Sequence, residues 1–475
     1  MSFKKSKITS QKEDFSKWYH DVVKEAELAE NSEVRGCGVV KPYGYKIWEL
    51  IKSDLAKRIE DSGVENVYFP IFVPLENLER EKDHVEGFSP ELAVVTHGGG
   101  EELVNKLAIR PTSESAMYTT YAKWIQSYND LPLRLNQWNN VVRWEKRPRP
   151  FLRWSEFQWQ EGHTVFANKE DAIEEVWQML DIYKQTYNYL AIPVFSGKKS
   201  EMEKFAGADM TTTVEIMVKD GKALQGGTSH YLGTSFAEAF GVTYMGEDEK
   251  EHLCHQNSWG FSWRSVGAVI MTHGDDNGLR LPANVAPVQI VIVPIFKEKN
   301  KDKVLKYSRK IVEDLKEYRV KIDDREDQTP GFKYNYWEVK GVPVRLEIGE
   351  KEVDEKKATI FRRDLNEKEE CKMNKLNKRI PNLFTEIHNN LYEQAKNFAK
   401  KHIHRIESID EIDDRVGFFE ASWSETRESE ELLKEKTGMV SRVLTTENEK
   451  SKPKNKKCFI TGKPAKHDWL FGKCY

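Results

Sequence analysis

The 475-residue sequence lacks the features that mark membrane, secreted or disulfide-stapled proteins. No apolar run reaches the ~20 residues that a membrane-spanning helix needs, and the longest candidate, from Val285 to Phe296, is interrupted by Pro287 and Pro294. Five cysteines are few, odd in number and scattered, which fits reduced thiols better than a disulfide framework. The basic N-terminal heptapeptide has no apolar segment behind it, so we expect no signal peptide, no membrane partner and a cytoplasmic protein.

An excess of charge of one sign is also missing. The formal net charge is −3, so any contact with RNA must use local basic patches and not the overall charge. Hydrophobic residues at 39% and charged residues at 32% describe a soluble globular protein. The length exceeds what one core usually supports and indicates two or three domains.

The first part of the chain predicts a mixture of helices and strands. Helical spacing of apolar residues begins after Gly44 and ends at Gly63. An extended, mostly buried segment follows, then a second helix, and then two strands that form an antiparallel pair around a basic, proline-broken loop. A third helix and a β-rich region complete this part. The predicted ranges are 67–74 for the extended segment, 113–128 for the second helix, 141–145 and 156–165 for the strands, 170–189 for the third helix, and up to residue 282 for the β-rich region.

After Pro287 the pattern changes to strands that alternate with helices. Strands are predicted at 288–293, 320–322, 342–348 and 359–361, and helices at 301–318 and 380–400. This alternation indicates a small α/β domain with a mixed or parallel sheet. Past His404 the sequence is charged and shows no continuous helix or strand pattern. It contains a lysine-rich linker at 450–457 and ends in an aromatic tail.

Residues whose side chains could bind a ligand or take part in catalysis gather around the predicted strand pair. Arg143 and Glu145 lie two apart on the first strand, so both side chains are predicted to project to one face. An isolated pair of this kind is more often a surface ion pair than part of a binding site. Here a cationic loop follows, and the second strand carries a one-sided row of aromatic and charged side chains: Phe157, Trp159, Glu161 and His163.

Three other segments strengthen the prediction of a binding site. Residues 110–114 start a helix, where Thr112 or Ser113 can act as the N-cap and Glu114 lies in the first turn. Residues 224–233 contain Gly226-Gly227 followed by Thr, Ser and His, which is about equally consistent with a turn or with a wall close to a ligand. Residues 258–265 place Arg264 just ahead of a buried helix, where it can present its charge to an anionic ligand.

Together these segments resemble the class II aminoacyl-tRNA synthetases, and within them the prolyl-tRNA synthetases. Residues 67–74 resemble the dimer-interface motif, residues 143–163 the second motif, and Ser262-Trp263-Arg264 with its helix the third. The resemblance implies an α+β catalytic domain with an antiparallel sheet in residues 1–285. It also implies a small α/β anticodon-binding domain in 286–403, a C-terminal α/β domain in 404–475, and a homodimer.

The spacing of the motifs indicates which form of the family the chain resembles. Only 101 positions separate His163 from Arg264, which leaves no room for the large editing domain of bacterial-form prolyl enzymes. The chain therefore resembles the archaeal and eukaryotic form. Because a site discriminates weakly against a ligand that lacks only methylene groups, we expect measurable activation of alanine.

The resemblance also implies roles for individual residues in the activation of proline by ATP and its transfer to tRNA(Pro). Arg143 and Arg264 are the implied catalytic residues. Implied contacts to proline come from Thr112, Glu114, Arg143, Trp159, Glu161, His163 and His230. Implied contacts to ATP, which brings Mg²⁺, come from Arg143, Glu145, Arg153, Trp154, Phe157, Gln225, Thr228, Ser262 and Arg264. Implied anticodon contacts come from Lys333, Glu338, Arg345, Glu347 and Arg362. The terminal carboxylate of Tyr475 is expected to point towards the active site.

The C-terminal region departs from the family pattern. Related enzymes often hold a zinc ion there with four cysteines, whereas this chain retains Cys458 and Cys474. Four ligands are not visible in the sequence, so we expect no structural zinc and no other protein-bound metal.

Three alternatives stay open at this point. A sister enzyme specific for threonine or histidine would share the ATP residues. A non-catalytic tRNA- or protein-binding relative should have lost the arginines of the ATP site, yet Arg143 and Arg264 are both present. An unrelated ATP- or RNA-binding module is disfavoured because neither a Gly-x-x-x-x-Gly-Lys loop nor an RNA-recognition signature occurs.

Overall fold

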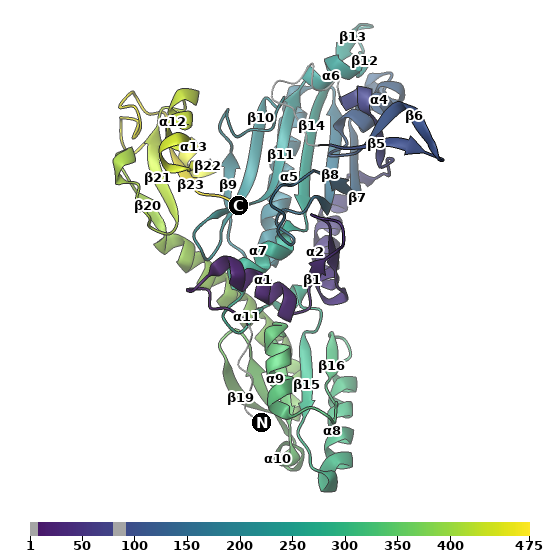
Figure 1. Ribbon diagram of the computed structural model, residues 1–475, viewed down its shortest axis with the longest axis vertical. Helices are drawn as coiled ribbons and strands as arrows, with labels where there is room; N and C mark the ends of the chain where they lie inside the picture. The colour runs from purple at the N-terminus through teal and green to yellow at the C-terminus, as the bar shows by residue number, and fades with distance from the viewer. Residues whose placement is uncertain (1–7, 79–91) are drawn as a thin grey trace.

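A computed structural model of the chain describes residues 8–78 and 92–475 and places them in three units (Figure 1). The largest unit is built on a long antiparallel sheet and contains the N-terminal half of the chain. A five-stranded unit lies at one end of the molecule, and the C-terminal unit lies beside the edge of the large sheet (Figure 1). The basic N-terminal heptapeptide lies outside the described residues.

An eleven-stranded sheet connects the first and last units. Its order is β20-β21-β23-β22-β9-β10-β11-β14-β8-β7-β3. The seven strands of the large unit are β3 (Glu65–Asn66), β7 (Leu133–Val142), β8 (Glu156–Phe166), β9 (Phe195–Lys198), β10 (Met210–Met217), β11 (Ala223–Gly233) and β14 (His255–Ser262). Neighbouring strands from β9 to β7 are antiparallel, and β3 alone in this unit pairs in parallel. The predicted antiparallel sheet is therefore confirmed.

The predicted strand pair is present, but its first strand ends earlier than expected. β7 and β8 pair with Val141 opposite Phe157, and β7 ends at Val142. Arg143 and Glu145 therefore lie on the connecting loop, and the prediction that both lie on a strand was wrong. The main-chain N–H of Glu145 donates to the hydroxyl of Ser155 (3.1 Å), and the prolines that follow cannot donate to a ladder.

Alternation along β8 separates a helix-covered face from an open face. Phe157, Trp159, Glu161 and His163 lie on one face, as predicted. The residues between them point towards the helices: the Gln160 amide donates to the Tyr183 hydroxyl on α5 (2.6 Å), and Gln158 accepts from the Trp48 indole on α2 (3.0 Å). One face is therefore committed to core packing and the other is available for a site.

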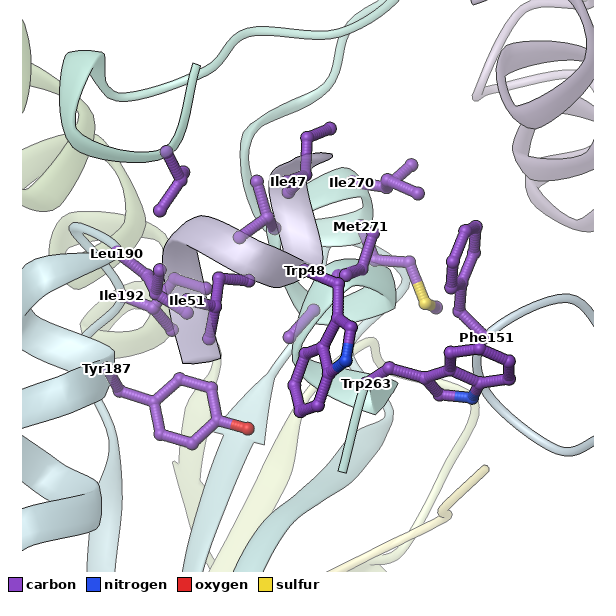
Figure 2. Close-up of a cluster of buried hydrophobic side chains, with 14 of the residues drawn as sticks. Ile47, Trp48, Ile51, Phe151, Tyr187, Leu190, Ile192, Trp263, Ile270 and Met271 are labelled. Carbon is purple, nitrogen blue, oxygen red and sulfur yellow. The ribbon is translucent and has the colours of Figure 1, made fainter. Parts of the chain in front are cut away.

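The helices of the large unit lie on both sides of the sheet, and two of them, Glu114–Trp124 and Ser235–Phe240, pack around Val165 and Leu232 on the open face. The helices are α1 (Phe15–Glu25), α2 (Pro42–Asp61), α4 (Glu114–Trp124), α5 (Lys169–Tyr189), α6 (Ser235–Phe240) and α7 (Arg264–His273). The ranges of α2 and α5 confirm two predicted helices, and α4 is shorter than predicted. Figure 2 shows Trp48 of α2 beside Met271 of α7, and Ile51 of α2 beside Leu190 and Ile192, in one buried core. This core holds α7, and with it Arg264, against the sheet.

Gly226 and Gly227 lie inside β11 and not in a turn, so the turn interpretation was wrong. A Cβ added at Gly226 would lie 2.6 Å from a ring carbon of Tyr187, and one added at Gly227 would lie 3.0 Å from Tyr183. Both glycines therefore let the tyrosines of α5 pack closely on the sheet. The same backbone lines the open face on the other side.

Smaller sheets surround the large one. The predicted extended segment contains a short strand, β4 (Phe72–Pro74), which pairs with β6 (Glu101–Ile109), and β6 pairs with β5 (Ala93–Gly98). Two further hairpins are β1 (Ala29–Asn31) with β2 (Gly38–Val40), and β12 (Thr243–Met245) with β13 (Glu251–Leu253).

The five-stranded unit has the predicted α/β character with a mixed sheet. Its order is β16-β15-β17-β18-β19, with parallel pairs around β15 and antiparallel pairs around β18. Its helix α11 is much longer than predicted and contains Pro381. The elements are β15 (Ile290–Pro294), α8 (Lys301–Asp314), β16 (Val320–Ile322), α9 (Pro330–Val339), β17 (Val344–Ile348), α10 (Glu350–Asp354), β18 (Lys357–Arg362), β19 (Glu367–Lys372) and α11 (Met373–Lys401).

The C-terminal unit contains more helices and strands than its interrupted sequence pattern indicated. It contains β20 (Ile403–Arg405), β21 (Phe418–Trp423), α12 (Arg427–Thr437), β22 (Val440–Thr445), α13 (Thr446–Glu449) and β23 (His467–Gly472), which confirms the α/β class. Within the described residues, none of the helices combines the length and the apolar character that a membrane span requires.

Candidate active site

A cavity of about 220 Å³ opens on the face of the central sheet opposite α5. Its walls come from β8, β10, β11 and β14, the start of α4, the start of α7 and the loop after β7. It gathers most of the residues that the sequence singled out, namely Thr112, Glu114, Arg143, Phe157, Trp159, Glu161, His163, Gln225, Thr228, His230, Ser262 and Arg264. Residues separated by up to 152 positions in the chain thus share one site.

The centre of one end of the cavity is a buried carboxylate, Glu161, which is 1% exposed. It accepts hydrogen bonds from the main-chain N–H of Ser113 (3.0 Å) and the amide of Asn139 (2.7 Å), and it contacts His163 Nε2 at 3.1 Å. The Ser113 hydroxyl also donates to it. Ser113 therefore bonds across to β8, and the predicted side-chain cap of α4 is not formed.

The pKa values in this cluster are separated by their surroundings. Burial by itself would raise the pKa of Glu161, but hydrogen bonds and the charge of His163 lower it to about 2. Burial disfavours the charged imidazolium of His163, yet Glu114 and Glu161 together raise its pKa above the ordinary value. Burial, His163 and Arg143 lower the pKa of His230 to about 3. At neutral pH the end of the cavity therefore holds an ionised Glu161 and a neutral His230.

Glu114 adds a second carboxylate to this cluster. The Thr112 hydroxyl donates to Glu114 and lies 3.3 Å from Glu161. Ligand atoms of Glu114, Glu161 and His163 all lie within 4.8 Å of one another. Their arrangement is suited to surrounding one small cationic group.

Arg143 lies between the carboxylate cluster and the aromatic part of the cavity. Its Nε donates to the carbonyl of Pro111 (2.9 Å), and its guanidinium carbon lies 5.4 Å from the ring centre of Phe157 and 5.1 Å from that of Trp159. These contacts fix the fork-shaped group at the boundary of the two parts, where it can meet an anion.

Arg264 lies at the first position of α7. Its Nε donates to the carbonyl of Leu152 (3.1 Å) and its Nη1 to that of Gln225 (3.4 Å). The start of α7 also contributes a favourable dipole for an anion. Ser262 and Thr228 line the same end. The cavity thus has an acidic end near Glu161 and a basic side formed by Arg143 and Arg264.

Three residues predicted to contact the nucleotide do not line this cavity. The Trp154 ring is 4% exposed and packs against Phe151 (5.6 Å) and Trp263 (5.5 Å), so the ring does not line the cavity, and the contact of Trp154 to the nucleotide stays a prediction. Trp154 also covers Gly38, where a Cβ would lie 1.9 Å from the indole. Glu145 and Arg153 lie on the loop outside the cavity, with Arg153 Nε 3.7 Å from Glu145 Oε2.

The C-terminal Tyr475 is held in place and does not line the cavity. Its main-chain N–H donates to Ala223 at the start of β11 (3.1 Å), and its hydroxyl donates to Asp220 (2.5 Å). Arg149 and Lys222 lie 5.2 and 4.9 Å from its ring centre. The end of the chain is therefore fixed beside the basic loop that follows β7.

The predicted anticodon residues form part of an internal charge network of the five-stranded unit. Arg345 pairs with Glu338 (2.6 Å) and Glu347 (3.0 Å) and lies between the rings of Tyr334 and Phe361, each 4.0 Å away. Lys333 is 2% exposed and donates to the carbonyl of Asp323, and Arg362 pairs with Asp364 and Glu386. Among the five predicted residues Glu338 keeps 26% of its side chain exposed.

Sequence reasoning missed several residues of the site. Asn139 lies two positions before Val141 on β7, so strand alternation could have found it. Ser113 was seen only as a possible cap. The remaining missed residues come from the segment after β9 and from β10, for which the sequence gives no chemical signal: Lys199, Glu203, Lys204, Phe205 and Thr211.

Comparisons with known proteins cover nearly the whole chain. Residues 98–273 match the tRNA synthetase class II core domain (G, H, P, S and T), residues 289–383 an anticodon binding domain, and residues 406–475 the C-terminal domain of prolyl-tRNA synthetase. The chain is 48% identical over 448 residues to the proline–tRNA ligase of Natranaerobius thermophilus, covering 93% of each chain. It is 47% identical over 475 residues to that of Clostridium novyi, covering 98% of each.

A solved structure agrees with these relatives. The prolyl-tRNA synthetase of Cryptosporidium parvum, complexed with halofuginone and AMPPNP, superimposes with a TM-score of 0.93 at 42% identity. The match covers 98% of this chain and 99% of that one.

The acid stability of the protein should report the ionised Glu161. Because the pKa of this group is about 2 in the folded state and about 4.3 in an unfolded chain, its ionisation adds roughly 3 kcal/mol of stability above pH 5. This contribution is lost as the pH falls from about 5 to about 2. We expect Glu161→Gln to flatten the pH dependence of the free energy of unfolding across that window, measured by fluorescence-monitored denaturation. Exposed Glu247→Gln is the control, and equal slopes for both variants would contradict the assignment.

Proposed function

Because the chain belongs to the prolyl-tRNA synthetase family, we propose that it activates L-proline with ATP and transfers it to tRNA(Pro) in the cavity described above. The observation that carries this proposal is the buried cluster of Glu114, Glu161 and His163 directly beside Arg143. An amino acid carries a cationic amino group and an anionic carboxylate on one carbon. The amino group fits the carboxylates of the cluster, and the carboxylate fits Arg143. The side of the cavity lined by Gln225 and Arg264 is then left for the nucleotide.

The acidic end is suited to the secondary ammonium group of proline. Glu114, Glu161 and Thr112 accept or share its two hydrogens, because charge-assisted hydrogen bonds in a buried site are strong. The ring packs against Trp159, His163 and His230. The low pKa of His230, about 3, keeps its imidazole uncharged beside the apolar ring.

The basic side is suited to ATP. Arg143 bridges the carboxylate of proline and the α-phosphate, and Arg264 holds the γ-phosphate end. Phe157 stacks on the adenine, while Gln225, Thr228 and Ser262 complete the nucleotide site. Glu145 and Arg153 contribute from the loop that follows β7.

In the first step a carboxylate oxygen of proline attacks the α-phosphorus and pyrophosphate leaves. In the second a ribose hydroxyl of tRNA attacks the prolyl carbonyl and AMP leaves. The side chains act by positioning the reactants and stabilising the developing charge.

Mg²⁺ accompanies ATP in this proposal. Near Arg264 the cavity offers neutral oxygen atoms of Gln225, Thr228 and Ser262, which fit an ion that keeps most of its shell as water and phosphate oxygens. When bound with ATP, the ion would supply positive charge that offsets the charge of the phosphates. For structural zinc we maintain the expectation of none, because the C-terminal region offers two cysteines, Cys458 and Cys474, where a structural site needs four ligands.

Other parts of the proposal concern assembly and tRNA. The protein acts as a homodimer in the cytoplasm, and its five-stranded unit reads the anticodon through Glu338 and the network behind it. The three regions 1–285, 286–403 and 404–475 serve as the catalytic, anticodon-binding and C-terminal domains. Family membership sets aside an unrelated module and a threonine- or histidine-specific sister, and the two arginines in the cavity favour a catalytic protein over a binding relative.

Amino-acid-dependent pyrophosphate exchange across all twenty amino acids tests the proposed substrate. Proline should give the highest kcat/KM, and alanine should give measurable exchange at high concentration, because missing methylene groups cost a site only about 1–3 kcal/mol. Arg264→Gln is the control, which should abolish exchange with every amino acid. A different best substrate would contradict the proposal, and no exchange with alanine would contradict the expected weak discrimination.

Substitution of Glu338 tests the anticodon assignment without removing a fully buried charge. Glu338→Gln keeps the side-chain volume and should raise the KM for tRNA about tenfold, because one good base contact contributes about 1–3 kcal/mol. Proline-dependent exchange should not change. Glu313→Gln, an exposed position on α8 of the same unit, is the matched control. Equal losses in charging and exchange, or no loss in either, would contradict the assignment.

A further inference from the structure

The C-terminal unit joins the catalytic sheet where a wall of the cavity begins. Strand β22 pairs with β9, with Leu444 opposite Lys198 and Thr445 opposite Gly197. A Cβ added at Gly197 would lie 1.8 Å from the carbonyl oxygen of Leu444, so glycine permits this close approach. The chain then runs directly from β9 into the segment 199–205, and Lys199, Glu203, Lys204 and Phe205 of that segment line the cavity.

A buried ion chain links the C-terminal unit to this wall. Arg442 Nη2 of β22 lies 2.7 Å from Glu215 Oε2 on β10, and Lys199 Nζ lies 2.8 Å from Glu215 Oε1. The three side chains are 4%, 0% and 2% exposed. Burial would raise the pKa of Glu215, but Lys199 and Arg442 hold it below the ordinary value, so the carboxylate is ionised at neutral pH. Loss of one member would leave a buried charge without its partner.

A second set of contacts holds the start of the same wall. The Ser441 hydroxyl of β22 lies 2.9 Å from the Ser200 hydroxyl, and Ser200 donates to Glu430 of α12 (3.1 Å). The carbonyl of Ser200 in turn accepts from the main-chain N–H groups of Glu203 (3.2 Å) and Lys204 (2.9 Å). The turn that carries the cavity-lining residues is therefore anchored on β22 and α12.

The far end of the wall meets the acidic end of the cavity. The N–H of Phe205 donates to the Thr211 hydroxyl (2.9 Å), which lies 2.9 Å from His230 Nδ1. The ring of Phe205 lies 4.7 Å from that of His230. By contrast, Arg143 and Arg264 are held by carbonyls of Pro111, Leu152 and Gln225, which belong to the catalytic unit.

We propose that the C-terminal unit positions the amino-acid end of the active site, with Arg442 as the principal positioning residue. Through Glu215 and Lys199, Arg442 fixes the wall 199–205 and with it Phe205, Thr211 and His230. This inference rests on the proposed function, since it assigns proline to that end. It gives the C-terminal unit a task that requires neither a metal ion nor contact with the nucleotide.

The test compares Arg442→Met and Arg442→Lys with the wild-type full-length protein in pyrophosphate exchange. Proline is varied at saturating ATP, and ATP at saturating proline. Arg442→Met should raise the KM for proline by about tenfold or more and the KM for ATP by less than about twofold, because a loosened wall affects one substrate. Arg442→Lys should restore part of the proline KM, since it keeps the charge.

The matched control is Arg405→Met. Arg405 pairs with the nearly buried carboxylate of Asp468 (3.1 Å) inside the C-terminal unit, so its removal disturbs that unit without touching the wall. Both KM values should stay at the wild-type level. An equal change of both KM values in Arg442→Met, no change in either, or the same effect in Arg405→Met would overturn the inference.

Ser441→Ala keeps the test decisive if Arg442→Met does not fold. It should raise the KM for proline about threefold by removing the hydroxyl contact to Ser200, and an unchanged value would overturn the inference. Absence of proline-dependent exchange in the wild type has a different meaning. It would refute the proposed function. If the wild type shows exchange and the variants keep the wild-type KM for proline, the positioning role alone is refuted.

Discussion

The need to keep one carboxylate charged inside the protein determines how the active site is assembled. Glu161 is buried at the centre of β8, where an unpaired charge would be very costly. Its partners come from the start of α4, from β7 and from β8 itself, so these elements must meet at one point. The buried Arg110 supports this junction by donating to the carbonyls of Phe69 (2.7 Å) and Asn140 (2.9 Å). The polar network that keeps Glu161 ionised therefore also fixes the geometry of the cavity.

The same physical rule operates on the other side of the cavity. Glu215 is fully buried on β10, and its two cationic partners come from the catalytic and the C-terminal units. The main-chain ladder between β9 and β22 makes the two units parts of one sheet. A change in the C-terminal unit can therefore reach the cavity over a short, rigid path. The five-stranded unit has its own mixed sheet and its own charge network around Arg345, so its contribution to function is separable.

Periodicity and turn chemistry predicted much of the fold and of the site. The row Phe157, Trp159, Glu161 and His163 was correctly placed on one face because strand alternation has a fixed period. The end of β7 was missed because a hydroxyl, that of Ser155, replaced a ladder partner. The burial of the Trp154 ring was not predicted because it depends on a contact with Gly38, which is distant in the sequence. Gly226 and Gly227 were read as a possible turn, although they serve to admit Tyr187 and Tyr183.

The bridge between units could not have been predicted from local patterns. Lys199 and Arg442 are 243 positions apart in the chain, and the local sequence around each predicts only a charged side chain exposed to solvent. Only the pairing of β22 with β9 brings them to Glu215. The resemblance to a known family supplied residue roles, but it did not indicate which side chains hold the site residues in place.

Titration calorimetry of L-proline against the wild type and Glu161→Gln, with AMPPNP as the nucleotide probe in a parallel titration, tests the central claim most directly. Glutamine keeps the shape of the side chain and removes its charge. The account predicts that proline binding weakens by about 10- to 100-fold, the range expected for a lost charge-assisted hydrogen bond, while AMPPNP binding is unchanged. Unchanged proline affinity in Glu161→Gln would contradict the account.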